Sequence, residues 1–479
     1  MPIDFSRFDG SGREPRAQQI QALEYLSKHW DDDKHFVLCL DTGSGKQALA
    51  RAVQLATNGA IVVPTNELMN QAKRDYADLS GLKGAAHYKC SSSELGTSQT
   101  CSDKVKKLKH KPCVGCPFWE AKHNAKMAKA TIFNVFSYWY AKKTQEEEYK
   151  VLIIDEAHAV LEQIKSFCGQ NFKIAPHERE LDFENTFVLL TWLDDRIDKE
   201  PKDSKKREAI EFLRKCIMDT PEIFSAKARS KFLEIRPVLI PYGIVKKFFG
   251  DTKLIMMSAT FTPDVRKSLT MGEPHHYLEL PSPIPVENRT VMMQGPGICM
   301  KEITPKETAE EIEKVLARYP GLNTLVHMTY KASKEIEPFM RTKVITHNSG
   351  DDKAVKLAEF KEKGGVLFGS GMMEGIDLPG DLCRLVIVPR MHLPNMGDHM
   401  IKKRTNLRDG WMWYRSKAMV DFRQQIGRGV RGADDWAKIV VLDSRFSSYV
   451  NYTWRVQPKY FLEAIDWEHK WKKQFIGKK

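Results

Sequence analysis

The 479-residue sequence lacks any apolar run long enough to cross a membrane, and its apolar runs have the length of strands. Residues 1–7 lack the basic and then apolar order of a secretory signal peptide. No tandem repeat is present, which excludes a solenoid. We therefore expect a cytoplasmic protein without membrane contact, in a compartment where thiols stay reduced.

Cysteine is also scarce, with nine residues in the whole chain. In a reducing compartment this number does not predict a disulfide framework. Cys39 and Cys383 lie in apolar, strand-like runs and are expected in the core. Four others fall within one short segment, which makes that segment a candidate metal site: Cys90, Cys101, Cys113 and Cys116.

The charge balance is basic, with 75 Lys and Arg against 62 Asp and Glu and a formal net charge of +13. A surplus of this size favours a polyanionic partner, of which nucleic acid is the commonest. Composition alone leaves scattered, solvating lysines as an equal alternative.

Short apolar runs alternate with helical stretches in two successive sets, which predicts an α/β protein with two tandem parallel-sheet domains. The first set comprises residues 36–40, 60–63, 151–154 and 253–257, and the second comprises residues 323–327, 365–368, 385–388 and 438–442. Two segments interrupt the first set. Residues from about 87 to 130 are rich in Cys, Ser and Lys, and residues from about 165 to 240 are charged and predicted helical.

A glycine-rich loop follows the first apolar run and precedes a helical stretch, as a phosphate-binding loop requires. Its candidate nucleotide contacts are Thr42, Gly43, Ser44, Gly45, Lys46 and Gln47. The glycines let backbone N–H groups turn toward phosphate oxygens, and Lys46 would neutralise the β- and γ-phosphates. Two positions depart from the strict Walker pattern: Leu40 replaces a glycine, and Gln47 stands where Ser or Thr would contact Mg²⁺. By itself the loop also fits an ordinary glycine turn.

The sequence Asp155-Glu-Ala-His158 directly follows the run 151–154. Ligands of open α/β sheets collect at the carboxyl ends of the strands, where these carboxylates would emerge. Asp155 can hold Mg²⁺, and Glu156 can orient or deprotonate the attacking water. A strand that ends in acidic residues is common by chance, but this one lies downstream of a GSGK loop. The two motifs together predict an ATPase.

Four further motifs resemble those of superfamily 2 helicases: residues 63–68 (VPTNEL, motif Ia), 258–260 (SAT, motif III), 369–380 (GSGMMEGIDLPG, motif V) and 424–431 (QQIGRGVR, motif VI). The resemblance implies two RecA-like domains and an ATP-driven motor. It also implies nucleotide contacts from His158, Gly375 and Asp377. Arg428 and Arg431, which lie three apart and so share one face of a helix, would act as arginine fingers, and Gln424 would complete that face.

Within that superfamily the chain most resembles the XPD/DinG branch, from about residue 13 to residue 446. Residues 13–19 (REPRAQQ) are similar to the adenine-recognition segment of the branch, with Arg16 and Gln19 as the contacts. Residues 282–289 (SPIPVENR) and 442–445 (LDSR) are similar to two further segments of the branch, in its order.

The four-cysteine segment lies where the branch carries an iron–sulfur domain. Residues 87–90 (HYKC) and 116–122 (CPFWEAK) resemble its two ends. Four thiolates suit one [4Fe–4S] cluster, but the spacing alone suits tetrahedral zinc equally. The resemblance therefore decides for iron–sulfur. Phe118 and Trp119, with the lysine face of Lys122, Lys126 and Lys129, are candidates for contacts with nucleic acid, or else form a small core and a solvated face.

The expected domains are residues 1–86, 131–164 and 241–270 for the first RecA-like domain and 87–130 for the iron–sulfur domain. Residues 165–240 would form a reduced, helical Arch-like insertion. Residues 271–479 would form the second RecA-like domain, with a C-terminal amphipathic helix over 458–473 that packs on it.

We therefore expect a 5′→3′ DNA helicase that uses ATP, Mg²⁺ and a [4Fe–4S] cluster, acts as a monomer and binds single-stranded DNA and forked duplexes. RNA stays open as a substrate, and the compact size suits a bacterial or viral origin. Two alternatives remain. The small Arch-like insertion suits a single-strand translocase that does not unwind, and Gln47 suits a nucleic-acid binding module with weak ATP turnover.

Overall fold

The computed structural model describes residues 8–467 except 33, 85–86, 91–114, 129, 145–148, 242, 294–298, 300, 348–351, 371–377, 428, 431 and 433. The chain divides into two compact units. Unit 1 comprises Met1–Leu40, Gly45–Leu280 and Gly397–Leu407, and unit 2 comprises Asp41–Ser44, Pro281–Met396 and Arg408–Lys479. No helix among the described residues combines the length and the apolar character that a membrane crossing needs.

Unit 1 is built on a parallel sheet, which holds seven strands among the described residues in the order β10-β1-β9-β5-β2-β4-β3. The strands are β1 (His35–Cys39), β2 (Ala60–Val63), β3 (Ser80–Leu82), β4 (Thr131–Asn134), β5 (Val151–Ile154), β9 (Lys253–Ser258) and β10 (His275–Glu279). The inner strands are mainly apolar and, apart from the first residues of β1 and β9, buried, as expected where helices cover both faces of a sheet.

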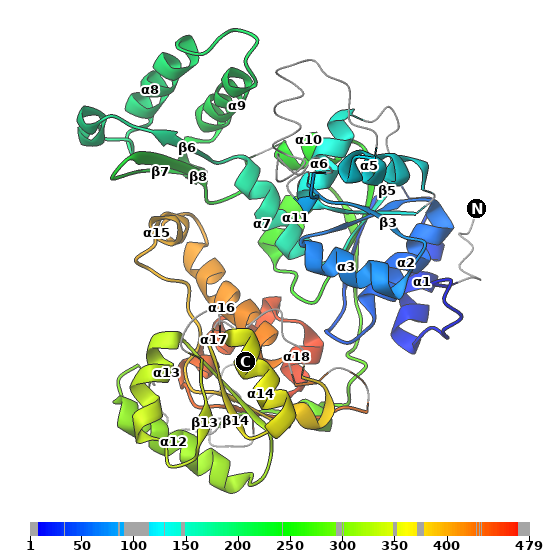
Figure 1. Cartoon of the computed structure of the whole chain (residues 1–479), viewed down its shortest axis with the longest axis vertical. Helices are drawn as coiled ribbons and strands as arrows, with labels where there is room; N and C mark the ends of the chain where they lie inside the picture. The colour runs from blue at the N-terminus through cyan, green and yellow to red at the C-terminus, as the bar shows by residue number, and fades with distance from the viewer. Residues whose placement is uncertain are drawn as a thin grey trace. The chain divides into compact units, whose positions relative to one another are not determined.

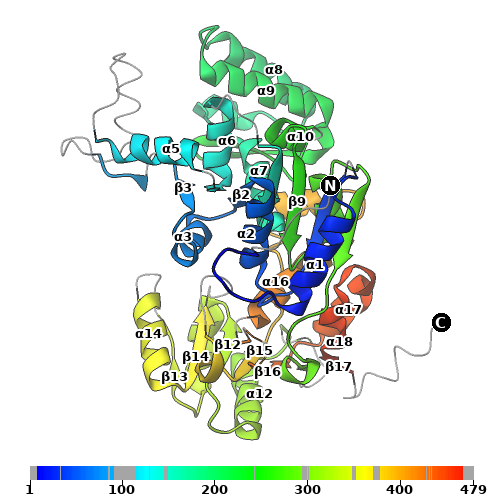
Figure 2. The same ribbon diagram turned by 90° about the vertical axis from the view of Figure 1, so that its right-hand side faces the viewer.

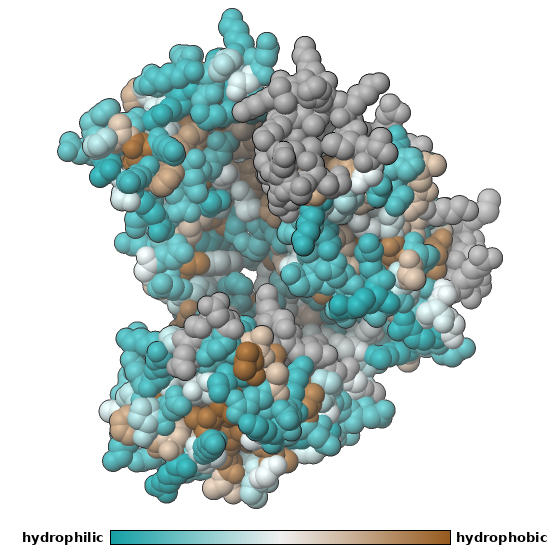
Figure 3. Space-filling view, in the orientation of Figure 1, coloured by the Kyte–Doolittle hydropathy of each residue, from teal (hydrophilic) through white to brown (hydrophobic). Residues whose placement is uncertain are grey.

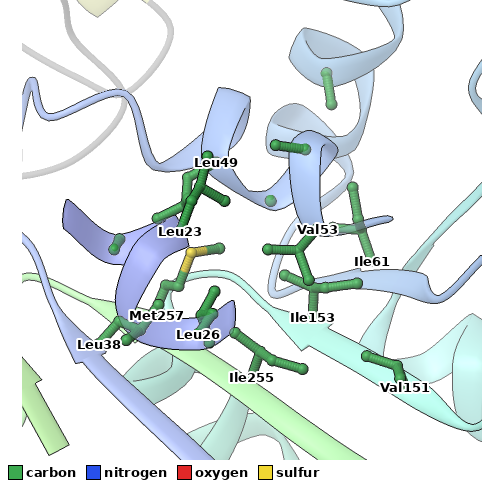
Figure 4. Packing of buried hydrophobic residues seen from close by; sticks show 14 of the residues in the cluster. Leu23, Leu26, Leu38, Leu49, Val53, Ile61, Val151, Ile153, Ile255 and Met257 are labelled. Carbon is green, nitrogen blue, oxygen red and sulfur yellow. The ribbon is translucent and has the colours of Figure 1, made fainter. Parts of the chain in front are cut away.

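The helices of this unit are α1 (Ala17–Lys28), α2 (Lys46–Thr57), α3 (Asn66–Asp75), α5 (Pro117–Met127), α6 (Val135–Thr144), α7 (Ala157–Phe167), α10 (Ile244–Phe249) and α11 (Pro263–Leu269). On one face of the sheet, α1 and α2 bury leucine and valine side chains against the strands, as Figure 4 shows for Leu23, Leu49 and Val53 over Ile153 and Ile255. Each such side chain contributes about 1.5–3 kcal/mol. An aromatic cluster packs elsewhere in the unit, where Trp139 of α6 stacks on Phe248 of α10 at 4.8 Å between ring centroids.

The insertion after α7 combines helices with a small antiparallel sheet, in the order β6-β8-β7. Its elements are β6 (Gln170–Lys173), η2 (Pro176–Glu180), α8 (Thr186–Asp198), α9 (Lys205–Asp219), η3 (Pro221–Ile223), β7 (Phe224–Arg229) and β8 (Phe232–Pro237). The expectation of a wholly helical insertion is therefore wrong. The hairpin escaped prediction because its two-residue turn, Ser230 and Lys231, lacks the Gly, Asn or Asp that marks such turns. The surface over α8 and α9 is mainly hydrophilic in Figure 3.

Glu178 of η2 connects the start of the insertion to α8. Its carboxylate accepts hydrogen bonds from the backbone N–H of Ala175 (2.6 Å), from Trp192 Nε1 (2.7 Å) and from Arg196 Nη2 (2.8 Å). The Arg196 guanidinium also lies 4.5 Å from the centre of the Trp192 ring. Partial burial acts to raise the pKa of Glu178, but these hydrogen bonds and the charge of Arg196 outweigh it and hold the pKa below its ordinary value.

We predict that Glu178→Gln destabilises the insertion by about 1–3 kcal/mol, because charge-assisted hydrogen bonds are lost. Since folding lowers the pKa of Glu178, the stabilisation is complete above the ordinary glutamate pKa of about 4.3 and is lost as the pH falls through the lower folded value. Hydrogen exchange of the α8 amides measures the effect at pH 7 and below pH 4.3. The exposed neighbour Glu180 gives the matched control, Glu180→Gln, and equal exchange in both variants would contradict the role of Glu178.

Residues 397–407 belong to unit 1 although the sequence places them within the second sheet domain. They contain α15 (His399–Thr405), whose His399 Nδ1 lies 2.7 Å from Ser225 Oγ of β7. Arg404 Nη2 lies 3.4 Å from Asp264 Oδ2 of α11. The expected second domain, 271–479, is corrected accordingly, since polar contacts of this kind leave no pattern in the sequence.

Unit 2 is built on a second parallel sheet, with seven strands in the described part of the chain and the order β13-β14-β12-β15-β16-β11-β17. The strands are β11 (Val291–Met293), β12 (Thr324–Met328), β13 (Val344–Ile345), β14 (Val366–Ser370), β15 (Leu385–Val388), β16 (Lys438–Val441) and β17 (Ile465–Asp466). The helices are η4 (Val286–Asn288), α12 (Pro305–Arg318), α13 (Tyr330–Ile336), η5 (Glu337–Phe339), α14 (Lys353–Lys363), η6 (Gly380–Leu382), α16 (Gly410–Ile426), α17 (Arg445–Thr453), η7 (Trp454–Val456) and α18 (Lys459–Glu463). The α/β fold with two parallel-sheet domains is thus confirmed.

Two expected boundaries are wrong. Residues 275–279 form β10, which pairs with β1, so the first sheet continues past the expected end at residue 270. The expected C-terminal helix over 458–473 is replaced, as far as residue 467, by the five-residue α18 and by β17, which pairs with β11. Tyr460, Phe461 and Ile465 are buried, so these residues pack onto unit 2 as expected. Residues 468–473 lie outside the described part of the chain.

Candidate nucleotide site

The glycine-rich loop joins β1 to α2. Gly43 and Gly45 have φ angles of 78° and 76°, a backbone conformation in which a residue with a side chain would be strained. Gly45 is also the N-cap of α2. A glycine cap adds no side chain of its own, so the first-turn N–H groups and the positive end of the helix dipole suit an anion. The Ser44 hydroxyl donates to the carbonyl oxygen of Asp41 at 2.8 Å and fixes the turn. The loop therefore has the geometry of a phosphate cradle.

Gln19 connects α1 to this loop. Its Nε2 donates to the carbonyl oxygen of Gly45 at 3.0 Å, and its Oε1 accepts from the backbone N–H of Arg16 at 2.8 Å. Gln19 is 3% exposed, and a Cβ at Gly45 would collide with its amide. The two residues predicted to contact adenine are thus adjacent, and the amide of Gln19 braces the loop.

Asp155 and Glu156 follow β5 at the same edge of the sheet. Asp155 is buried, and Glu156 adopts the left-handed conformation, with φ 48° and ψ 50°, as the N-cap of α7. Burial raises the pKa of Asp155, and the negative charge of Glu156 raises it further, whereas Lys46 acts in the opposite direction. The oxygens of two adjacent carboxylates are ligands that suit Mg²⁺. Asp155 therefore fits the ion predicted for it.

A chain of polar side chains links the loop, the acidic residues and the segment after β9. Lys46 Nζ lies 3.5 Å from Glu156 Oε1, and Glu156 Oε2 lies 3.5 Å from His158 Nδ1. That ring nitrogen lies 2.8 Å from Ser258 Oγ, which lies 3.2 Å from Thr260 Oγ1. The structure thus brings together residues that are far apart in the sequence, because β1, β5 and β9 are parallel neighbours and end at one edge.

Gln47 is the one loop residue whose chemistry departs from the expected pattern. Its Nε2 is buried and has no hydrogen-bond partner among the described residues. The amide thus occupies the first turn of α2, in the position where Ser or Thr would contact Mg²⁺, without being fixed by a partner at that nitrogen.

The structure describes only part of the predicted motif VI. Helix α16 ends at Ile426, and Gly429 and Val430 are not helical. The expectation that Arg428 and Arg431 share a helical face falls on residues outside the described part of the chain. Arg428 and Arg431 themselves lie outside the described residues, as do Gly375 and Asp377. Gln424 lies in the last turn of α16.

The ends of the cysteine segment lie close together. The rings of Tyr88, two residues before Cys90, and Phe118, two residues after Cys116, meet edge to face at 5.6 Å. Cys90 is half-buried and Cys116 is buried as the N-cap of α5. Cys101 and Cys113 lie outside the described residues. The ring contact brings the two ends of the segment together, and four cysteines within it are a donor set that fits a four-cysteine metal site.

Trp119 and Lys122 lie next to each other on α5, where Trp119 is exposed and Lys122 is partly buried. Trp119 is 43% exposed, and Lys122 Nζ lies 4.9 Å from the centre of its ring. Burial, and then repulsion from Lys126, lowers the pKa of Lys122. Because α5 ends at Met127, the expected face of Lys122, Lys126 and Lys129 reaches only to Lys126 on the helix, and Lys129 lies outside the described residues.

Sequence reasoning missed a side-chain network near motif Ia. Asn134 Nδ2 donates to Asn66 Oδ1 at 2.6 Å, and Asn66 Nδ2 lies 3.1 Å from His87 Nε2. Asn66 therefore connects motif Ia to the start of the cysteine segment. The signal that could have revealed Asn134 was its place at the carboxyl end of an apolar strand.

Comparison with known sequences identifies two family profiles. One, described as "Helicase C-terminal domain", matches residues 308–459, and the other, "Type III restriction enzyme, res subunit", matches residues 13–186. A probable ATP-dependent helicase of Methanocaldococcus jannaschii is 23% identical over 347 residues, 64% of this chain and 52% of that protein. The ATP-dependent DNA helicase CHL1 of Vanderwaltozyma polyspora is 30% identical over 142 residues, 24% of this chain and 17% of that protein. The chain thus spans about half the length of the first relative and less of the second.

Solved structures share the fold. An XPD helicase has a TM-score of 0.59 and 16% identity, covering 92% of this chain and 98% of that one. The Xpd4 protein of S. tokodaii has a TM-score of 0.55 and 13% identity, covering 94% of this chain and 99% of that one. At such low identity the likeness establishes the architecture, which is that of two RecA-like domains in tandem.

Proposed function

We propose that this chain is an XPD-like helicase of superfamily 2 that hydrolyses ATP to move along single-stranded DNA in the 5′→3′ direction and to open forked duplexes. The observation that carries the proposal is the polar chain from Lys46 through Glu156 and His158 to Ser258. It supports roles for Lys46 as the cation that neutralises phosphate, for Glu156 as the base for water and for His158 as a relay to Ser258.

Each residue of that chain has a proposed role. The backbone from Gly43 to Lys46 cradles the phosphates, and the Lys46 ammonium neutralises charge on the β- and γ-phosphates. Asp155 holds Mg²⁺, which supplies further charge neutralisation when bound. Glu156 orients a water molecule and takes its proton as the water oxygen bonds to the γ-phosphorus and the bond from that phosphorus to ADP breaks.

His158 is proposed to report the state of the nucleotide. Its Nδ1 faces both Glu156 Oε2 and Ser258 Oγ, so a change of charge on Glu156 changes which oxygen the imidazole favours. Ser258 also accepts a hydrogen bond from the backbone N–H of Thr260 at 3.0 Å, so the motif III segment would move with it. This supports a link between hydrolysis and movement of the segment after β9.

A DNA track is supported by the net charge of +13 and by the relatives, of which one is named a DNA helicase. The most direct test is unwinding of a forked duplex by the full chain with ATP, beside displacement of streptavidin from biotinylated single strands. The proposal predicts opening of forks with a free 5′ arm and displacement from 3′ ends. Displacement without unwinding would identify a translocase, activity on RNA alone would replace the substrate, and neither activity would contradict the proposal.

A [4Fe–4S] cluster held by Cys90, Cys101, Cys113 and Cys116 is proposed for the cysteine segment. The contact between Tyr88 and Phe118, which brings its ends together, supports a shared metal centre. We predict that anaerobically purified protein is brown and contains about four iron atoms per chain, and that Cys116→Ser loses both. Cys168→Ser, which removes a buried thiol elsewhere, should keep the colour. Colourless protein with one zinc ion would contradict the cluster.

The second candidate function, a binding module with weak turnover, is favoured by the buried and unpartnered Nε2 of Gln47. We predict that Gln47→Thr raises ATP turnover about two- to tenfold, because a hydroxyl is better placed than a longer amide to contact Mg²⁺. Steady-state ATP hydrolysis at saturating DNA measures the change. Gln21→Thr, at an exposed glutamine of α1, tests for general effects of the substitution. A wild type without turnover that threonine restores would favour the binding module.

A further inference from the structure

The amino edge of the unit 1 sheet carries a cluster of three metal-binding side chains that the proposed motor does not use. His29 is the C-cap of α1, Asp32 follows it in the loop to β1, and His276 lies on β10. All three ligand atoms lie within 4.8 Å of one another. Because β1 and β10 are parallel, this edge is opposite the one that carries the glycine-rich loop.

We propose that His29, Asp32 and His276 bind a zinc ion that joins the end of α1 to the outer strand β10. Two imidazole nitrogens and one carboxylate oxygen are a ligand set that zinc accepts, with a water molecule as the fourth ligand. The site lies apart from the cysteine segment in ligand chemistry and in the fold.

The distances are close to those of a zinc site. Asp32 Oδ2 lies 2.8 Å from His276 Nε2 and 3.6 Å from His29 Nδ1. Bonds of about 2.0–2.2 Å in a tetrahedron place neighbouring ligand atoms about 3.4 Å apart. Small rotations of the partly buried His29 and the exposed Asp32 would therefore suffice to bring all three atoms onto one ion.

The Nε2 nitrogen of His276 points toward the other two side chains of the cluster. This nitrogen is buried and faces Asp32 Oδ2 at 2.8 Å, and the hydrogen-bond geometry at this nitrogen is not satisfied by any described residue. When Nε2 carries no proton, its lone pair and the carboxylate both face the space between them, and a cation there is attracted to both. The same two groups that form an ion pair when His276 is protonated can therefore act as two ligands of a metal ion.

The surroundings hold the ligands in position. The Nδ1 of His276 lies 3.4 Å from Tyr25 Oη, and its ring stacks on Phe36 at 4.9 Å. Such a contact at the second ring nitrogen orients a metal-binding imidazole. Lys253 Nζ donates to the backbone oxygen of Asp32 at 2.8 Å, so the loop is fixed and the ammonium group is engaged with the backbone.

Titration of the full chain with Zn²⁺ by calorimetry tests the proposal, with its cysteine centre left intact. We expect one site of nitrogen and oxygen ligands in the wild type, and a loss of about 100-fold in affinity in His276→Gln and His29→Gln. His275→Gln is the matched control, because neighbouring residues of a strand point to opposite faces. It should bind zinc as the wild type does.

Cobalt spectroscopy and melting temperatures distinguish this site from binding at the cysteines. Co²⁺ in place of Zn²⁺ should give visible absorption without a sulfur-to-cobalt charge-transfer band, which separates this site from thiolates. Zinc should also raise the melting temperature of the wild type and of His275→Gln but not of Asp32→Asn, which keeps the shape of the side chain. Equal zinc affinity in Asp32→Asn, His29→Gln and the wild type, or no binding outside the cysteines, would overturn the site. ATP hydrolysis by the same samples reports separately on the motor.

Discussion

Lys46→Ala is expected to weaken ATP binding and to lower DNA-stimulated ATP hydrolysis by about 10²–10³-fold. The side chain is 10% exposed, and its ammonium group is the cation that neighbours both carboxylates of the site, being 3.5 Å from Glu156 Oε1. Its removal leaves the γ-phosphate beside two negative groups with one positive charge fewer. Binding of a fluorescent ATP analogue and steady-state hydrolysis measure the two effects.

Lys28→Ala serves as the control for this change, because Lys28 is an exposed lysine at the end of α1. It should leave both quantities within about twofold of the wild type, as surface substitutions usually do. Melting temperatures of the two variants should agree closely. If Lys46→Ala hydrolysed ATP at the rate of Lys28→Ala, the loop would not be a phosphate site and the assignment of the motor would fail.

Glu156→Gln should separate binding from chemistry. The amide keeps the size of the side chain and its N-cap position on α7, so ATP affinity should stay near that of the wild type. The base that takes the proton from water is lost, and hydrolysis should fall by about 10²–10⁴-fold. Binding and turnover measured together distinguish this pattern from that of Lys46→Ala, which loses both.

The matched control is Glu162→Gln, an exposed glutamate on the same helix. Its ATP turnover should stay within about twofold of the wild type. A loss of less than tenfold in Glu156→Gln would show that another group activates the water, and His158 would be the next residue to test.

Much of the fold follows from the sequence because continuous apolar runs set the inner strands. β2, β5 and β15 begin and end at the predicted residues, and the other predicted strands differ by one or two positions. The order of parallel strands then brings Lys46, Asp155 and Ser258 to one edge. Local motifs on the correct elements therefore sufficed to find the candidate nucleotide site.

Three other features of the fold depend on tertiary contacts, which no local sequence pattern predicts. β10 reads His-His-Tyr-Leu-Glu and is half-buried along its length, so neither continuous apolarity nor alternation marks it as a strand. Its pairing with β1 nevertheless extends the sheet and places His276 beside Asp32. The hairpin of β7 and β8 turns without glycine, and α15 is fixed to unit 1 by polar contacts such as that of His399 with Ser225. Tertiary pairing, rather than propensity, decides each of these features.

The central claim is that ATP turnover at the candidate site is coupled to a nucleic-acid strand. The most direct measurement is steady-state ATP hydrolysis by the anaerobically purified full chain, with and without single-stranded DNA, beside Lys46→Ala under the same conditions. We predict that DNA raises the wild-type rate and that the rate saturates with DNA concentration, while Lys46→Ala stays at background. A wild-type rate equal to that of Lys46→Ala, with DNA or RNA present or absent, would contradict the account.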